Sequence, residues 1–93
     1  MESVFSRTFD PDRLLAGEDP KSDLPEDADH WIEVYAELLS FKHELIRVAE
    51  NHGRRVRNEG QAEVDNDLEV MRMERERLLR RLEFWAARRR DLI

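Results

Sequence analysis

Apolar residues recur at alternating steps of three and four along two long segments of the chain. In the first segment the recurring positions are Trp31, Val34, Leu38, Phe41, Leu45 and Val48. This alternation is the heptad pattern of a helix with an apolar seam along one side. Pro25 suits the first turn of a helix, and His52 followed by Gly53 is typical of a helix end. The pattern therefore predicts a helix over about 25–52.

The second segment continues the same alternation towards the end of the chain. Its positions are Val64, Leu68, Met71, Arg75, Leu78, Leu82, Trp85, Arg89 and Leu92. Asn58 and Gln61 have the spacing of a capping box, and Gly60 falls between them. We predict a second helix over about 62–92 and a bend over about 53–61. At 1.5 Å per residue, each helix is about 40 Å long.

A connection of fewer than about ten residues makes the two helices antiparallel neighbours. The fold class that we predict is all-α, a coiled-coil-like hairpin of two antiparallel helices. Further apolar residues widen both seams: Tyr35, Leu39, Ile46, Ala49, Leu79, Ala86 and Ile93. One hairpin buries each seam on one side only. We therefore expect the remaining apolar surface to meet a second copy, giving a homodimeric four-helix bundle, or to meet a different protein.

The predicted contact surface consists of the larger residues of both seams. They are Trp31, Val34, Leu38, Phe41, Leu45, Met71, Leu78, Leu82 and Trp85. Trp31 and Trp85 fall at the open end of an antiparallel hairpin, far from the bend. An aromatic pair at that place is typical of a core, and it also suits a binding hot spot.

Residues 1–24 precede the helices as an acidic arm that contains Pro11, Gly17 and Pro20. Few of these residues are apolar, and we expect a flexible, mostly irregular segment. Asp10 followed by Pro11, with Gly17 as a stop, predicts a short helical turn over 11–16. The alternative is a docking segment that lays its apolar residues in a groove. Those residues are Phe5, Phe9 and Leu14.

Composition agrees with long helices and limits the chemistry. Charged residues make up 41% of the chain, while glycine and proline number three each. The chain has no cysteine, which excludes disulfides and thiolate metal sites. No apolar run approaches the roughly 20 residues that cross a bilayer, and the first residues lack the pattern of a secretory signal. We expect a cytoplasmic protein without membrane contact.

Signatures of catalysis are missing from the sequence. It contains no phosphate-binding glycine loop and no nucleophile elbow. The three histidines, His30, His43 and His52, never lie three or four residues apart, which is the helical spacing of a zinc pair. We therefore predict that the protein is not an enzyme and holds neither a metal nor a cofactor.

Charge is divided unevenly along the chain. Residues 1–30 carry nine acidic and three basic side chains, whereas residues 68–93 carry five acidic and eight basic ones. The two ends therefore suit mutual attraction, within one chain or between copies. The arginines Arg80, Arg81 and Arg88–Arg90 flank Phe84 and Trp85, a combination that nucleic-acid binders use. Because Glu76 and Glu83 interrupt these arginines, a solvated charged face is the favoured interpretation, and nucleic-acid binding ranks third among the functions considered.

The bend region has a second interpretation besides that of a turn. Glu50, Arg54, Arg57, Gln61 and Asp65 resemble the Glu-x3-Ser-x2-Arg-x3-Gln-x3-Asp motif of the cyclic-di-GMP-responsive anti-sigma factors, with Arg54 at the serine position. That resemblance implies a helical hairpin that regulates transcription and binds a cyclic guanine dinucleotide. Arginine and aspartate suit the edges of guanine. The ligand residues would be Arg54, Arg57, Gln61 and Asp65.

A broader resemblance covers most of the chain. The stretches "LLAGEDPKSDLPEDADHWIEVYAELLSFKHELI" and "ERERLLRRLEFWAARRRDL" look like small, functionally uncharacterised helical proteins of the actinobacterial type. This resemblance implies a helical hairpin in the cytoplasm and implies no catalytic residues. The leading hypothesis is accordingly a non-catalytic adaptor or regulatory module that acts by protein–protein contact and self-association. A ligand-responsive, anti-sigma-like regulator is the alternative.

Overall fold

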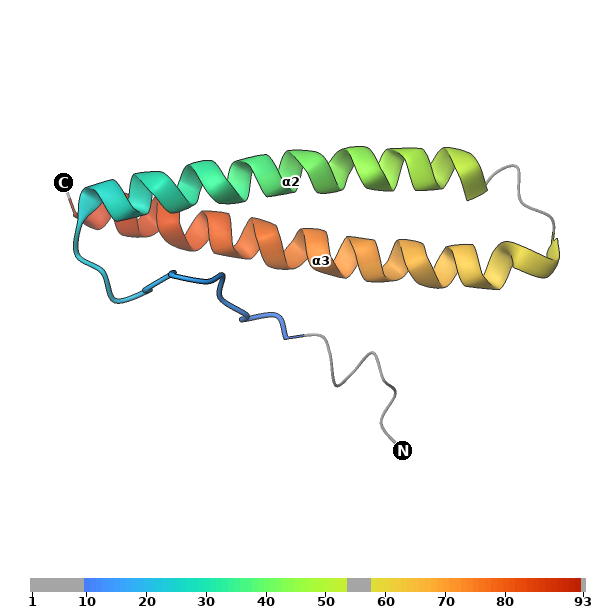
Figure 1. Cartoon of the computed structure of the whole chain (residues 1–93), viewed down its shortest axis with the longest axis horizontal. Coiled ribbons are helices and arrows are strands. Elements are labelled where there is room, and N and C mark those ends of the chain that lie inside the picture. The colour runs from blue at the N-terminus through green and yellow to red at the C-terminus, as the bar shows by residue number, and fades with distance from the viewer. Residues whose placement is uncertain (1–9, 54–57, 93) are drawn as a thin grey trace, which may run out of the picture.

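The computed structural model describes residues 10–53 and 58–92, and two long helices dominate it (Figure 1). Helix α2 spans Pro25–Gly53 and helix α3 spans Asn58–Asp91. The helices run side by side in opposite directions and contact each other along their length. The predicted all-α hairpin is confirmed.

A network of polar groups fixes the start of α2. The Ser22 hydroxyl donates to Asp27 Oδ2 at 2.6 Å and accepts from the Leu24 amide at 3.3 Å. The Asp27 amide donates to the Leu24 carbonyl at 3.1 Å. Glu26 and Asp27 place negative charge in the first turn, where the helix dipole favours it. The helix therefore begins at Pro25, as the sequence predicts.

Helix α3 begins earlier than the sequence predicts, at Asn58 instead of about 62, so the predicted bend of about 53–61 is too long. Gly60 lies inside the helix. A glycine in a helix costs about 1 kcal/mol relative to alanine, which a helix of 34 residues tolerates. The Gln61 side chain also donates to Asp65 Oδ1 at 2.8 Å, a pair one turn apart that supports the first turns.

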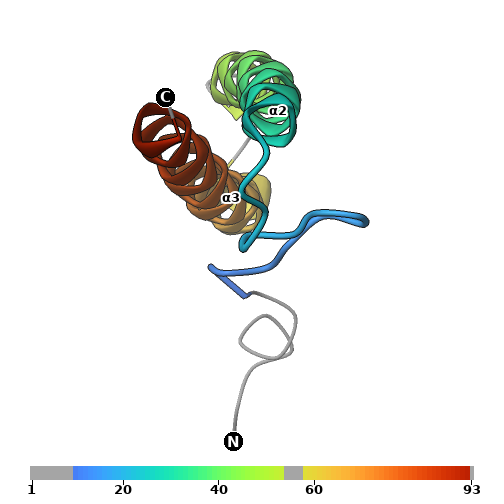
Figure 2. The same cartoon turned by 90° about the vertical axis from the view of Figure 1, so that its left-hand side faces the viewer.

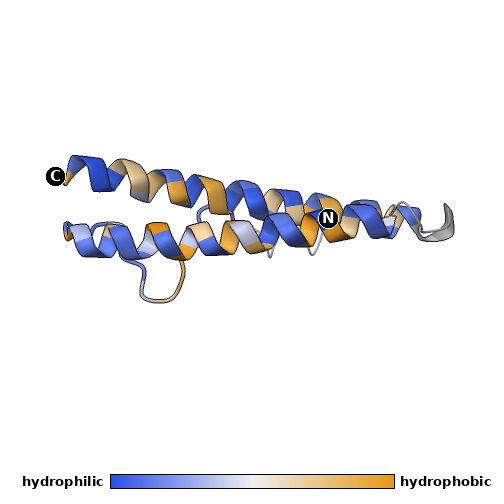
Figure 3. Ribbon diagram, turned by 90° about the horizontal axis from the view of Figure 1, so that it is seen from above, coloured by the Kyte–Doolittle hydropathy of each residue, from blue (hydrophilic) through white to orange (hydrophobic). Residues whose placement is uncertain are grey.

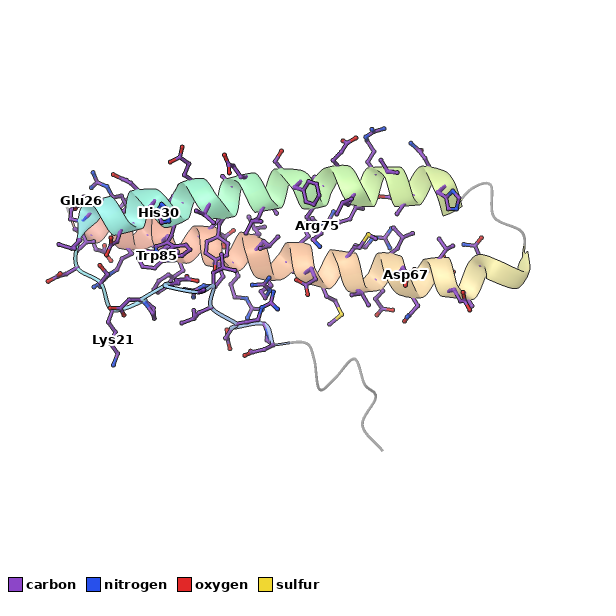
Figure 4. The ribbon with its side chains drawn as sticks, viewed as in Figure 1. Lys21, Glu26, His30, Asp67, Arg75 and Trp85 are labelled. Atoms are coloured by element: carbon purple, nitrogen blue, oxygen red, sulfur yellow. The ribbon has the colours of Figure 1, made fainter. Side chains whose placement is uncertain are left out.

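The core of the hairpin is concentrated at its open end. Ala28 and Tyr35 of α2 pack there with Leu78 and Trp85 of α3, and all four side chains are buried. Figure 4 shows Trp85 where the helices and the arm meet. Nearer the bend, Ile46 and Leu68 are the other buried apolar side chains of the described residues.

The seam of α3 follows the predicted repeat, but that of α2 does not. Leu68, Leu78 and Trp85 are buried as expected. On α2 the residues that face α3 include Tyr35 and Ile46, which the sequence predicted only to widen the stripe. At 100° per residue, they lie about a quarter turn away from the predicted seam.

The predicted seam of α2 is largely exposed beyond its first two members. Four residues of it form a row along one side of the helix, and we call them the outer stripe. They are Leu38, Phe41, Leu45 and Val48, with exposed fractions of 36, 64, 37 and 51%. Figure 3 shows hydrophobic residues recurring along the helix pair. These four residues are therefore not buried against α3 within one chain.

Residues 10–24 lie against one face of the helix pair and do not form the predicted helical turn over 11–16 (Figure 2). Two tight turns replace it. The Arg13 amide donates to the Asp10 carbonyl at 3.2 Å, and the Glu18 amide donates to the Leu15 carbonyl at 3.0 Å. Gly17 has a φ of +83°, a conformation that favours glycine. The turn that contains it places Glu18 against both helices.

The two helices approach closely near the bend at Gly53. A Cβ atom at this position would lie 2.9 Å from Val64 Cγ1, closer than side chains tolerate. We predict that Gly53→Ala lowers the free energy of unfolding by about 1 kcal/mol through overpacking. The same change in a Val64→Ala background should cost nothing, because the clash is gone. Urea unfolding of the four proteins measures the coupling, and an equal cost in both backgrounds would contradict this close approach.

Candidate interaction surface

A single buried carboxylate joins the arm to both helices. Glu18 Oε1 accepts from the Tyr35 hydroxyl of α2 at 2.5 Å and from the Leu15 amide at 2.9 Å. Glu18 Oε2 accepts from Arg81 Nη2 and from Trp85 Nε1 of α3, each at 2.7 Å. The Glu18 side chain has no exposed surface. We call Glu18, Tyr35, Arg81 and Trp85 the arm anchor.

Four donors keep this carboxylate charged despite its burial. Burial raises the pKa of Glu18, but the hydrogen bonds from Tyr35, Arg81, the Leu15 amide and Trp85 together hold it below its ordinary value of 4.5. Burial and the bond to Glu18 raise the pKa of Tyr35 to about 12. Burial lowers the pKa of Arg81, but the hydrogen bonding and charge attraction of Glu18 and Tyr35 together outweigh this, and the net shift is upward. The cluster therefore holds one negative and one positive charge at neutral pH.

Aromatic rings surround the ion pair of the arm anchor. The Arg81 guanidinium lies over the Phe84 ring, 4.4 Å from its centroid. Phe84 in turn packs edge-on against Trp85 with centroids 5.2 Å apart. Within the described residues Arg81 Nε is buried without a hydrogen-bond partner, and it is the one such side-chain atom. Since the carboxylate is closed to solvent and already holds four donors, it suits an anchor and not a catalytic acid.

Other arginines of α3 hold the backbone of the arm. Arg77 Nη1 donates to the Arg13 carbonyl at 3.4 Å. Arg88 donates to the Ser22 carbonyl from two nitrogens, at 3.1 and 3.0 Å. Ion pairs between α3 and the arm also balance part of the uneven charge within one molecule, as one of the two predicted arrangements requires.

The anchor residues Glu18, Tyr35 and Arg81 were not predicted as a site from the sequence. Glu18 is one of several acidic residues in the arm, and its burial depends on contacts more than 60 positions away along the chain. Gly17 was the available signal, since a left-handed turn there directs the next side chain inward. Sequence analysis assigned Gly17 only to the end of a helical turn.

The outer stripe borders a cavity that opens between the helices and the arm. The cavity has a volume of about 270 Å³. Its walls are Leu38, Phe41 and Lys42 of α2, Glu74, Arg77 and Leu78 of α3, and Arg13 and Leu15 of the arm. The side of the stripe that faces α3 is therefore lined by apolar side chains, by three cations and by one carboxylate, which pairs with Arg77.

The structure divides the predicted contact residues into three groups, by their burial within one chain. Leu78 and Trp85 are 3 and 0% exposed within one chain, so they belong to the intrachain core and are not free for a partner. Of the remaining residues, Leu38, Phe41 and Leu45 are exposed. Those that are partly buried are Trp31, Val34, Met71 and Leu82.

The other predicted sites lie partly outside the described residues. Phe5 and Phe9 of the docking hypothesis fall there, while Leu14 is 40% exposed on the arm. Arg54 and Arg57 of the dinucleotide hypothesis also fall there. The two ligand residues of that set on α3, Gln61 and Asp65, contact each other. Dinucleotide binding stays a prediction.

Over residues 10–53 and 58–92, no group of three or more histidine, aspartate or glutamate side chains is placed to hold a metal ion. Neither α2 nor α3 has an apolar stretch of the length that a bilayer crossing requires.

Comparison with known proteins gives no relative: no family model matches the chain, and neither the curated proteins nor the solved structures contain a significant match. The arrangement of side chains is therefore the basis of the functional argument.

Loss of the buried charge should loosen the arm. We predict that Glu18→Gln lowers the free energy of unfolding by about 3 kcal/mol at pH 7, because Arg81 is left buried without its counter-ion. Urea unfolding followed by tryptophan fluorescence measures this. Asp12→Asn is the matched control, since Asp12 meets Arg80 at 3.6 Å in an exposed pair and should contribute little. Equal effects of the two changes would contradict the anchor.

The same anchor predicts a specific dependence on acid. A carboxyl whose folded pKa lies below 4.5 stabilises the fold fully above pH 4.5 and loses that contribution as the pH falls through the lowered value. The stability difference between the parent and Glu18→Gln should therefore shrink only below pH 4.5. A difference that already shrinks between pH 7 and 5 would contradict a lowered pKa.

Tyr35 offers an independent check at alkaline pH, because it is the only tyrosine of the chain. Its ultraviolet absorbance should titrate with a midpoint near pH 12 in the parent and closer to 10 in Glu18→Gln. Since this pKa is raised, the stabilisation from Tyr35 is complete below pH 10 and is lost as the pH rises through 12. A midpoint near 10 in the folded parent would mean that the hydroxyl is not held by Glu18.

Proposed function

We propose that this protein is a non-catalytic interaction module that acts by protein–protein contact and self-associates along the outer stripe of α2. The exposure of four large apolar side chains on one side of one helix carries this proposal. Soluble proteins seldom expose a contiguous apolar row of this kind unless a partner covers it. Phe41, at 64% the most exposed of the four, is a suitable aromatic anchor near the middle of the row.

The energy available from the stripe suits a weak, reversible dimer. Full burial of a large apolar side chain contributes about 1.5–3 kcal/mol, and these four are roughly half exposed. Eight such side chains from two copies would contribute on the order of 10 kcal/mol. Association itself costs about 4–15 kcal/mol, so we expect a dimer whose population depends on concentration. Such an equilibrium suits an adaptor or regulatory role, in which assembly follows the amount of protein.

Nucleic-acid binding is less well supported by the geometry. It would need the arginines and aromatic rings of α3 to face outward. Arg77, Arg81 and Arg88 instead donate to groups of the arm. Trp85 is fully buried, so its ring is not available for stacking on a base.

Substitution within the outer stripe tests the proposal. Leu45→Asp should weaken the dimer at least about 100-fold, because the interface would then bury one charge from each copy. Leu79→Asp is the matched control: Leu79 is 38% exposed, close to the 37% of Leu45, but lies on α3 outside the stripe. Sedimentation velocity over a range of concentrations measures assembly, and circular dichroism verifies that helicity is unchanged. A parent protein that stays monomeric at high micromolar concentration would contradict self-association.

A further inference from the structure

We infer that two copies associate with their α2 helices parallel, so that both bends lie at the same end of the dimer. The inference rests on the proposed self-association and adds its orientation. One observation carries it: the opposite charges of the two edges of the outer stripe, Lys42 on one edge and Glu37 on the other.

The outer stripe follows the core positions of a heptad. Leu38 and Leu45 occupy a positions, and Phe41 and Val48 occupy d positions. Lys42 follows a d position and is therefore an e residue. Residues 37 and 44 precede a positions and are g residues. In coiled coils, charges at e and g determine which orientation of the helices is stable.

The e edge of the stripe carries one charge, that of Lys42, and faces the rest of the molecule. Lys42 lines a cavity with Arg13 of the arm and with Glu74 of α3, whose carboxylate pairs with an arginine of its own helix. Tyr35, one heptad before Lys42, is buried against α3, which confirms that this edge points towards the hairpin.

The g edge of the stripe is acidic and exposed. It carries Glu37 and Glu44, on the side of the stripe opposite Lys42. Glu44 pairs with Arg47 on its own helix. Glu37 and Lys42 make no ion pair with any other described residue. Each side chain is therefore suited to form an ion pair with an opposite charge on another molecule.

Parallel packing makes these two edges complementary. In a parallel pair, the g edge of each helix lies along the e edge of the other, so Glu37 approaches Lys42 of the second copy. The two-fold axis produces this ion pair twice. In an antiparallel pair, each edge instead meets its own copy, which places lysine near lysine and glutamate near glutamate.

A charge exchange distinguishes the two orientations. Lys42→Glu or Glu37→Lys alone should raise the dimer dissociation constant about tenfold, because two attractive pairs become repulsive. The double variant Glu37→Lys/Lys42→Glu should restore the parental value, since the pairs are re-formed with exchanged signs. Sedimentation velocity measures all four proteins at low ionic strength. Single variants that dimerise like the parent would overturn the parallel arrangement.

Cysteine cross-linking tests the orientation directly, because the chain has no cysteine of its own. Val48→Cys should form a disulfide-linked dimer rapidly on mild oxidation, since parallel packing places the two copies of residue 48 side by side. Ser40→Cys is exposed on α2 outside the stripe and controls for random collision. In an antiparallel pair centred on the stripe, the two copies of residue 48 are about 15 Å apart, and a mixture of Leu38→Cys and Val48→Cys proteins would cross-link instead.

The outcomes separate the inference from the proposal on which it rests. Dimers that cross-link through residue 48, together with rescue by the double charge exchange, support the parallel arrangement. Dimers that cross-link only in the mixed experiment overturn that arrangement and leave self-association standing. A parent protein that remains monomeric, with no cross-link above the Ser40→Cys control, overturns both.

Discussion

The tertiary structure depends on the burial of one carboxylate. A buried negative charge is tolerated only with a counter-ion and enough donors, and no single segment of this chain supplies them for Glu18. Tyr35 contributes from α2, and Arg81 and Trp85 contribute from α3. Because the donors come from both helices, the charge fixes the arm and the helix pair relative to each other at the open end.

This requirement explains which face of α2 turns inward. Tyr35 has a hydroxyl that needs a partner once it is buried, and Glu18 provides it. The helix face that carries Tyr35 therefore packs on α3. The leucines and Phe41 of the outer stripe have no such polar group, and they remain a quarter turn away at the surface. One buried polar contact at the open end thus leaves an apolar row available for a second copy of the chain.

The basic side chains of α3 are used mainly for contacts within one molecule. Arginines of α3 bond to the arm or to α2, including Arg89, which donates to Asp29 Oδ1 at 2.8 Å. The acidic front and the basic tail are thereby partly matched inside one molecule. The charges that remain beside the outer stripe, Glu37 and Lys42, lie on opposite edges of α2. In the proposed dimer they would orient the second helix more than they would strengthen its binding.

The sequence by itself determined two long helices, their antiparallel pairing and the seam of α3, because helical periodicity is a local property that apolar spacing records. It also supplied Leu38, Phe41 and Leu45 of the outer stripe as part of the predicted contact surface, but it did not separate them from the residues that face α3. Only the tertiary structure decided that Tyr35 and Ile46 face α3 and that Glu18 is buried. The outer stripe and the face of α2 that carries Tyr35 and Ile46 are both apolar and of similar length. Periodicity alone therefore could not show which of them faces α3. The choice depended on hydrogen bonds between residues up to 67 positions apart, which no local pattern encodes.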